Sequence, residues 1–300
     1  MRARPPMLLI ATAAMLTVST AGCEAKVYGT PDGPSPVAGV PAPAESPHEV
    51  RAAAFDELPV RIARATDDAA ANGATIVVAI LDRANNQMLS NGNDQLVAIA
   101  SVAKLFIADD LLSQDSSSPD GIGQLSSPDR QALDSMLQSS DDGAAETFWA
   151  ARGGETIING VAGRYGLTST TPPSDGRWWN TMSSASDLVH YYDVLLNGSG
   201  GLSGERAEII VNDLAGSTAT GADGYPQRFG IPDGLYAETV AVKQGWMCCI
   251  GDSWMHLSTG IIGADRRYVM VIESLQPSDD ATARATITQA VKTMFPSGRI

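Results

Sequence analysis

The chain has 300 residues, enough for one large domain or two small ones, and a formal net charge of −14. Without residues 1–22, 18 basic side chains stand against 34 acidic ones. Nucleic acid is therefore not an expected partner, because affinity for phosphate backbones comes from Lys and Arg patches.

Residues 1–22 read as a secretory signal peptide. Two arginines precede an apolar run from Met7 to Val18, which is too short to span a membrane, and small residues lie directly before Cys23. This junction resembles the processing site of bacterial lipoproteins, in which the cysteine is lipidated and becomes the first mature residue. We expect secretion across the cytoplasmic membrane and a lipid anchor on Cys23 at the outer face of the cell membrane. The alternative is an ordinary secretory signal followed by an unrelated cysteine.

Residues 23–48 are predicted to form an extended tether. Six prolines lie between Glu24 and Pro47 among Gly, Ala and Ser, with too few large apolar side chains to offset the entropy of folding. At about 3 Å per residue, such a tether reaches at most ~70 Å. The folded domain is expected at residues 49–300.

Hydrophobic periodicity within this domain changes from helix to strand and back. The predicted helices are about 49–71, interrupted or kinked at Pro59, a helix carrying Ser101 and Lys104 to about Leu112, and then 130–137, 143–151, 156–165, 185–196, 204–214 and 279–294. The predicted strands are 75–81, a short one near Met88, 238–244, 254–262 and 267–274. Residues 113–128 and 168–180 are expected to be loops. Strands at both ends of the domain favour an α/β (α+β) fold, in which terminal helices flank one antiparallel sheet and an all-helical subdomain is inserted at about 104–235.

Ser101 and Lys104 form the first candidate for chemistry. On a helix, residues three apart lie on the same face and can share a hydrogen bond. A serine hydroxyl is a weak nucleophile until a neighbour takes its proton, and a desolvated lysine can do so. Lysine occurs only at positions 26, 104, 243 and 292, and the other basic side chains are arginines, which cannot give up a proton. A site that needs a titratable amine is one explanation for these few lysines.

Two later stretches complete a pattern. Ser140-Asp141-Asp142 lies between two predicted helices, and Lys243-Gln244-Gly245-Trp246 lies on a predicted strand. In order and spacing, the three stretches resemble the β-lactamase and penicillin-binding protein superfamily, with its Ser-x-x-Lys, Ser-Asp-Asn and Lys-Thr-Gly motifs. The resemblance covers about residues 49–300 and implies a β-lactamase-like fold.

The resemblance implies a role for each matching residue. Ser101 would be the acylated nucleophile and Lys104 its partner amine, Ser140 would pass a proton to the leaving nitrogen, and Lys243 would attract the substrate carboxylate. The backbone N–H groups of Ser101 and Trp246 would form the oxyanion hole. The remaining positions of the motifs would bind substrate: Asp142, Gln244, Gly245 and Trp246. No cofactor or metal is implied.

Departures from the family pattern limit the expected activity. Asp142 replaces asparagine and can only accept hydrogen bonds, and a carboxylate near Lys104 would raise the pKa of that amine. Gln244 replaces a short hydroxyl side chain, and Trp246 is bulkier than usual. No glutamate lies between Ile157 and Gly204, where class A β-lactamases place the residue that activates the deacylating water. Efficient β-lactam hydrolysis by that route is not expected, and Asp175 is too short a substitute.

The cysteines, histidines and neighbouring tryptophans each allow a structural interpretation as well as a functional one. Cys248 and Cys249 could bridge to each other, remain free thiols or link to another chain. Of the three histidines, only His256 lies near the cysteine pair in the sequence, which argues against a metal site, and His190 is interpreted as a helix-face residue. Trp178 and Trp179 could line a cleft, but packing is the favoured interpretation.

Two hypotheses follow. The first is an envelope lipoprotein with a serine acyl-enzyme site for β-lactams or D-alanyl-D-alanine-type peptides, slow in deacylation. The second is an inactive protein of the same fold that binds a cell-wall peptide or a protein partner. The sequence predicts no oligomeric state.

Overall fold

The computed structural model describes residues 55, 57–114 and 125–300. The predicted signal peptide, Cys23 and the 23–48 tether lie outside these residues. Within them, no helix is both long enough and apolar enough to cross a membrane.

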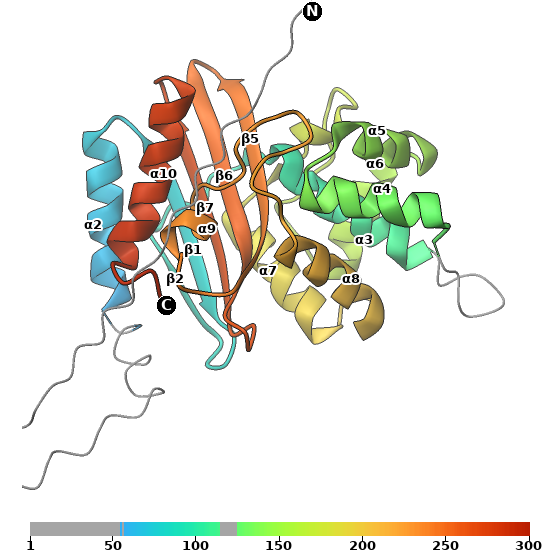
Figure 1. The fold of residues 1–300 in the computed structure, drawn as a ribbon, viewed down its shortest axis with the longest axis horizontal. Coiled ribbons are helices and arrows are strands. Elements are labelled where there is room, and N and C mark those ends of the chain that lie inside the picture. The colour runs from blue at the N-terminus through green and yellow to red at the C-terminus, as the bar shows by residue number, and fades with distance from the viewer. Residues whose placement is uncertain (1–54, 56, 115–124) are drawn as a thin grey trace, which may run out of the picture. The chain divides into compact units, whose positions relative to one another are not determined.

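A five-stranded antiparallel sheet forms the centre of the domain, in the order β2-β1-β7-β6-β5 (Figure 1). Its strands are β1 (Thr75–Asp82), β2 (Gln87–Ser90), β5 (Val240–Ile250), β6 (Ser253–Ile262) and β7 (Tyr268–Gln276). Side chains of β1 alternate between two cores, with Val77 and Leu81 in one and Ile76 and Val78 in the other. A strand whose two faces are both buried needs this uninterrupted apolar sequence.

The two terminal helices, α2 (Leu58–Ala71) and α10 (Asp280–Met294), cover one face of the sheet side by side (Figure 1). Buried residues of both helices join the core on that face. Asp279 caps α10 by accepting a hydrogen bond from the backbone N–H of Thr282 at 3.0 Å.

The other face of the sheet packs against a group of helices that the chain forms between β2 and β5 (Figure 1). They are α3 (Lys104–Gln114), α4 (Ser127–Gln138), α5 (Asp142–Ala151), α6 (Glu155–Tyr165), α7 (Ala185–Asn197) and α8 (Gly204–Ala215). The short α9 (Ile231–Gly234) follows them in the chain but packs on the opposite face, in the core shared with α2 and α10. The same part of the chain holds the 3₁₀ turns η1 (Ala100–Ala103) and η3 (Trp178–Asn180), and the two-stranded sheet of β3 (Val97–Ala98) and β4 (Met182–Ser183). The mixed fold with one antiparallel sheet, terminal helices and inserted helices confirms the predicted fold class.

Some predicted boundaries were wrong. Pro59 lies in the first turn of α2, which begins at Leu58, where a missing N–H costs nothing; residues 49–54 and 56 of the predicted 49–71 helix lie outside the described residues. Pro128 likewise lies in the first turn of α4, which begins inside the expected 113–128 loop. The strand expected at 238–244 begins at Val240 and runs on to Ile250 as β5, paired with β6 except at an irregularity between Met247 and Ile250.

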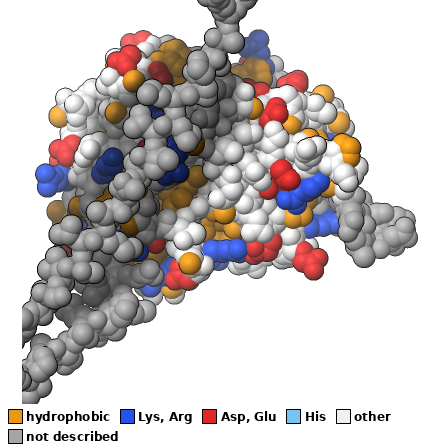
Figure 2. Space-filling view, viewed as in Figure 1, with side chains coloured by type: hydrophobic (Ala, Val, Ile, Leu, Met, Phe, Trp, Pro, Cys, Tyr) orange, Lys and Arg blue, Asp and Glu red, His pale blue; other side chains and the backbone are white. Residues whose placement is uncertain are grey.

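Charged side chains of both signs are scattered over the face drawn in Figure 2, among polar and hydrophobic ones. On this face, the acidic excess of the chain is not gathered into one patch.

Candidate active site

Ser101 lies in η1, the 3₁₀ turn that leads directly into α3, and Lys104 is the first residue of α3. The Lys104 Nζ donates a hydrogen bond to the Ser101 Oγ at 2.8 Å. Lys104 is fully buried and Ser101 is 8% exposed. The pair therefore meets as its spacing predicted, although through a 3₁₀ turn and not through an α-helix.

Ser140 reaches the same amine from the turn between α4 and α5. The Lys104 Nζ donates to the Ser140 backbone carbonyl at 2.8 Å and contacts its Oγ at 3.2 Å. The Asp141 carboxylate caps α5 by accepting from the backbone N–H groups of Gly143 and Ala144, which fixes this turn in place.

Lys243 completes the cluster from strand β5. Its Nζ donates to the Ser140 Oγ at 2.9 Å and to the Gln244 carbonyl at 3.3 Å. The structure thus brings together Ser101, Lys104, Ser140 and Lys243 from three separate segments of the chain.

Burial and neighbouring charges both shift the pKa values of the two amines. Burial lowers the pKa of Lys104, while the nearby charges of Asp142, Asp223 and Asp141 oppose that fall. The Asp142 Oδ1 lies 2.5 Å from the Lys104 Nζ. The pKa of Lys243 is held well below its usual value, first by complete burial and then by the charge of Lys104. Lys243 is therefore the more readily neutral amine of the two.

Gly245 and Gln244 have structural contacts in the fold. A Cβ on Gly245 would lie 2.7 Å from the Ile99 carbonyl oxygen, so glycine is what lets β5 approach η1. The Gln244 side chain is buried and donates to the carbonyls of Gln227 and Phe229, at 3.0 and 2.6 Å. Because successive side chains of a strand point to opposite faces, Gln244 faces away from the Ser140 contact made by Lys243.

Trp246 belongs to an aromatic cluster. Its ring stacks on Tyr225, with centroids 4.5 Å apart and planes within 9°. The Tyr225 hydroxyl contacts Asp280 and lies 2.7 Å from the His256 Nε2. Burial lowers the pKa of His256 to about 4, so this histidine is neutral at pH 7.

Two positions at the site have unusual backbone geometry. Ala100, directly before Ser101, has φ of 47°, and Ser140 has φ of 58°. The other two non-glycine residues with positive φ in the described ranges, Asn86 and Arg266, lie at turns between strands. Left-handed conformations of non-glycine residues are strained and gather at functional sites, which supports a functional reading of this cluster.

Three residues at the site were missed by sequence reasoning, and a fourth was assigned mainly to packing. Trp178 is buried, as expected, but its ring also covers the Lys104 Nζ, 4.6 Å from the centroid. The Trp178 Nε1 donates to the carboxylate of Glu146 at 3.2 Å. Asp223 and Tyr225 come from the loop between α8 and α9. Glu146 alone had a readable signal, since it lies four residues after Asp142 and so on the same helix face.

The remaining sequence candidates lie elsewhere. Cys248 and Cys249 are exposed on β5 and joined by a disulfide, which decides among the three alternatives. His190 is exposed on α7. Among the residues that the structure describes, no group of three or more His, Cys, Asp and Glu side chains could hold a metal ion.

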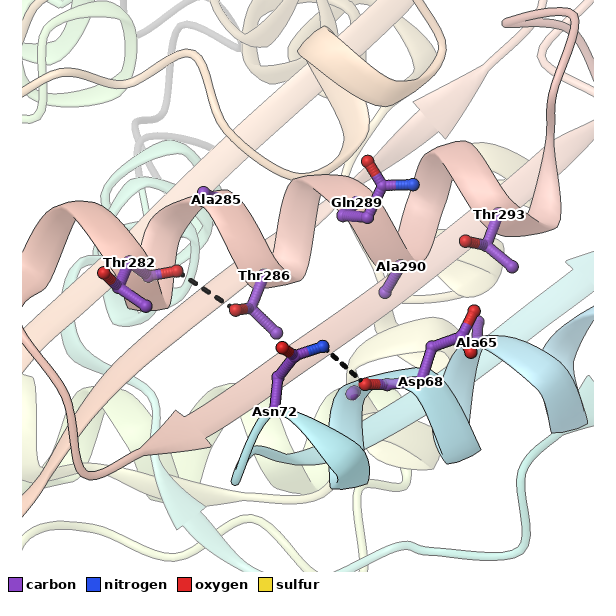
Figure 3. A pocket seen from close by; sticks show the side chains of 10 residues that line it. Ala65, Asp68, Asn72, Thr282, Ala285, Thr286, Gln289, Ala290 and Thr293 are labelled. Carbon is purple, nitrogen blue, oxygen red and sulfur yellow. Dashed lines mark hydrogen bonds between the residues drawn. The ribbon is translucent and has the colours of Figure 1, made fainter.

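A hollow of about 340 Å³ lies between α2 and α10, away from this site (Figure 3). Small residues such as Ala65 and Ala290 line it. Two of its polar side chains bond within their own helices: Asn72 donates to the Asp68 carbonyl and Thr286 to the Thr282 carbonyl. The hollow is a groove between packed helices.

Comparison with known proteins finds curated sequence relatives and solved structures of similar fold. No protein-family model matches the chain. Curated proteins from Mycobacterium bovis and Mycobacterium tuberculosis, each named "Putative lipoprotein LppW", are 63% identical to it over 321 aligned positions, covering all of both chains.

Solved structures similar to the chain are β-lactamases and a related protein. A β-lactamase from Chitinophaga pinensis matches with a TM-score of 0.62 and 14% identity, over 80% of this chain and all of that one. A mutant of PBP-A, solved as an acyl-enzyme complex with penicillin G, matches with a TM-score of 0.63 and 19% identity, over 81% of this chain and 96% of that one. At such identities the likeness shows the fold alone.

Proposed function

Because the chain belongs to the mycobacterial LppW family and has the β-lactamase fold, we propose that it is a lipid-anchored envelope protein whose Ser101 forms an acyl-enzyme. The observation that carries this proposal is the sharing of one buried amine, Lys104 Nζ, between the Ser101 Oγ and Ser140. β-Lactams and D-alanyl-D-alanine-type peptides are the first candidate substrates.

The reaction follows from these contacts. The Ser101 Oγ attacks the substrate carbonyl carbon, and its proton passes to the neutral form of Lys104. Ser140, which contacts Lys104 and Lys243, passes its hydroxyl proton to the leaving nitrogen as the carbon–nitrogen bond breaks, and takes in its place the proton that Lys104 received from Ser101, so that both side chains return to their starting forms. The products of this step are the Ser101 ester and the protonated leaving amine. Backbone N–H groups of Ser101 and Trp246 are the proposed oxyanion donors, each worth roughly 3 kcal/mol in the transition state.

Deacylation is expected to be slow. The segment between Ile157 and Gly204 holds no glutamate to activate a water, and it places Trp178 against Lys104 instead. A bulky aromatic ring beside the amine leaves less room for a hydrolytic water. The proposed enzyme therefore accumulates as the acyl form.

One observation favours a second function, in which the same site binds a cell-wall peptide or protein partner without chemistry. The Asp142 carboxylate, 2.5 Å from the Lys104 Nζ, favours the ammonium form, which cannot take a proton from Ser101.

Covalent labelling separates the two functions. The full chain and its Ser101→Ala variant are incubated with a reporter penicillin and with a fluorophosphonate, a neutral serine-directed probe, and intact masses are measured. An adduct that the variant lacks supports the acyl-enzyme. If neither probe adds mass to the wild type after long exposure, the binding function is preferred.

The proposed anchor has its own test. Detergent-phase partitioning of the wild type and of Cys23→Ala is compared after expression in a mycobacterial host. The wild type should enter the detergent phase and the variant should not. Equal partitioning would contradict lipidation at Cys23.

A further inference from the structure

We propose that the Ser101 site selects acyl donors that carry an ammonium group near the scissile bond, and discriminates against donors that carry a carboxylate there. This inference rests on the proposed function, because it concerns the same nucleophile. It differs from the carboxylate recognition that the resemblance implies for Lys243.

One exposed carboxylate borders the nucleophile on the α5 side. The Asp142 side chain is 68% exposed, although its Oδ1 touches the fully buried Lys104 Nζ. The carboxylate therefore reaches from the buried amine to the solvent. Glu146, one helical turn later and also exposed, accepts from the Trp178 indole that covers Lys104.

A second carboxylate comes from the loop between α8 and α9. The Ala222 N–H donates to the Ser139 carbonyl at 2.7 Å, which holds this loop against the turn that carries Ser140. Asp223 follows directly and is exposed, and its charge raises the pKa of both Lys104 and Lys243. Its negative field thus reaches the same two amines from a different segment of the chain.

The cationic groups that could offset these carboxylates are already engaged. Lys104 is paired with Asp142, and Lys243 is buried, with a lowered pKa and with hydrogen bonds to Ser140 and to the Gln244 carbonyl. The neighbouring strand β6 contains no Lys or Arg. In the loop that carries Trp178, the Arg177 Nε lies 3.8 Å from the Asp175 Oδ2, so this guanidinium also has a carboxylate partner. Each of these cations, in the part of the chain that the structure describes, thus has a partner already, so a ligand carboxylate would meet mainly negative charge, whereas a ligand ammonium would meet partners.

Three activated esters with one leaving group test the inference on the full chain. The probes are the p-nitrophenyl esters of β-alanine, butyric acid and succinic acid, which present an ammonium, a neutral methyl and a carboxylate at comparable reach. Acylation rates are followed by nitrophenol release and intact mass, and are divided by each ester's second-order rate constant with hydroxide, because the succinate ester's spontaneous hydrolysis is accelerated by its own carboxylate. We expect the ammonium ester to react about tenfold or more faster than the carboxylate ester, and the ratio to shrink as salt screens the charges.

Variants assign the effect to the named carboxylates. Asp142→Asn and Asp223→Asn should each reduce the ammonium-to-carboxylate ratio several-fold. Asp67→Asn, an equal change of charge at an exposed position on α2, should leave the ratio unchanged. Equal rates for the three esters, or an unchanged ratio in both site variants, would overturn the inference while the acyl-enzyme stands. If no ester acylates Ser101, the proposed function fails and this inference fails with it.

Discussion

Replacing Asp142 by asparagine should make Ser101 more reactive. The substitution keeps the shape of the side chain and removes a negative charge that lies 2.5 Å from the Lys104 Nζ. A pair of unit charges about 4 Å apart is worth about 1 kcal/mol in bulk water and about 4 kcal/mol at an effective dielectric constant of 20. Because Lys104 is buried and Asp142 is mostly exposed, a value of about 2 kcal/mol is reasonable, equal to about 30-fold in the protonation equilibrium of the amine.

The sign of the effect follows from the direction of the pKa change. Asp142 favours the ammonium form of Lys104, so its removal lowers the pKa of the amine beyond the lowering that burial already causes. Below that pKa, the neutral fraction should rise about 30-fold, and the rate of Ser101 phosphonylation should rise with it. At high pH, where the amine is neutral in both proteins, the two rates should converge.

The assay is the second-order rate of fluorophosphonate labelling between pH 5 and 9, measured by intact mass. The neutral probe avoids any direct attraction to the carboxylate. Ser101→Ala supplies the background and Asp67→Asn the control for a lost charge. An apparent pKa in Asp142→Asn that equals or exceeds the wild-type value would refute the electrostatic reasoning.

Three further predictions concern the amine, the close contact and a buried acid. Lys104→Arg should slow fluorophosphonate labelling of Ser101 by about 100-fold or more, because a guanidinium stays charged and cannot accept a proton. A labelling rate equal to that of the wild type would exclude Lys104 as the proton acceptor. Gly245→Ala should lower the free energy of unfolding in urea by about 1 to 3 kcal/mol, because the new Cβ would clash with the Ile99 carbonyl oxygen. The control is Gly160→Ala on α6, where a Cβ meets no atom within 4 Å, and it should not destabilise the protein. Burial raises the pKa of Glu273 from 4.5 to about 7, so ionisation of this acid lowers the free energy of unfolding as pH rises from 4.5 to 7, by up to about 3 kcal/mol. Glu273→Gln should therefore flatten the dependence of the urea midpoint on pH over this range. An equal slope in wild type and variant would contradict this.

The candidate site could be predicted from sequence to the extent that it depends on short spacings and strand alternation. The three-residue interval placed Ser101 beside Lys104, and motif order placed Ser140 and Lys243 with them. The same alternation could have shown that adjacent residues of a strand do not share a face, so Gln244 and Lys243 could not both point at Ser140.

The sequence by itself determined the places of the five strands of the central sheet, though not the end of β5, together with the terminal helices and the identity of the four polar residues at the site, because these depend on local hydrophobic periodicity and on short motifs. Only the tertiary structure decided which carboxylates lie close enough to Lys104 to change its pKa. Asp142 and Asp223 reach Lys104 across 38 and 119 positions of sequence, and the exposure of each carboxylate depends on how α5 and the α8–α9 loop pack around η1. Desolvation and distance set the strength of a charge interaction, and both are properties of the folded chain.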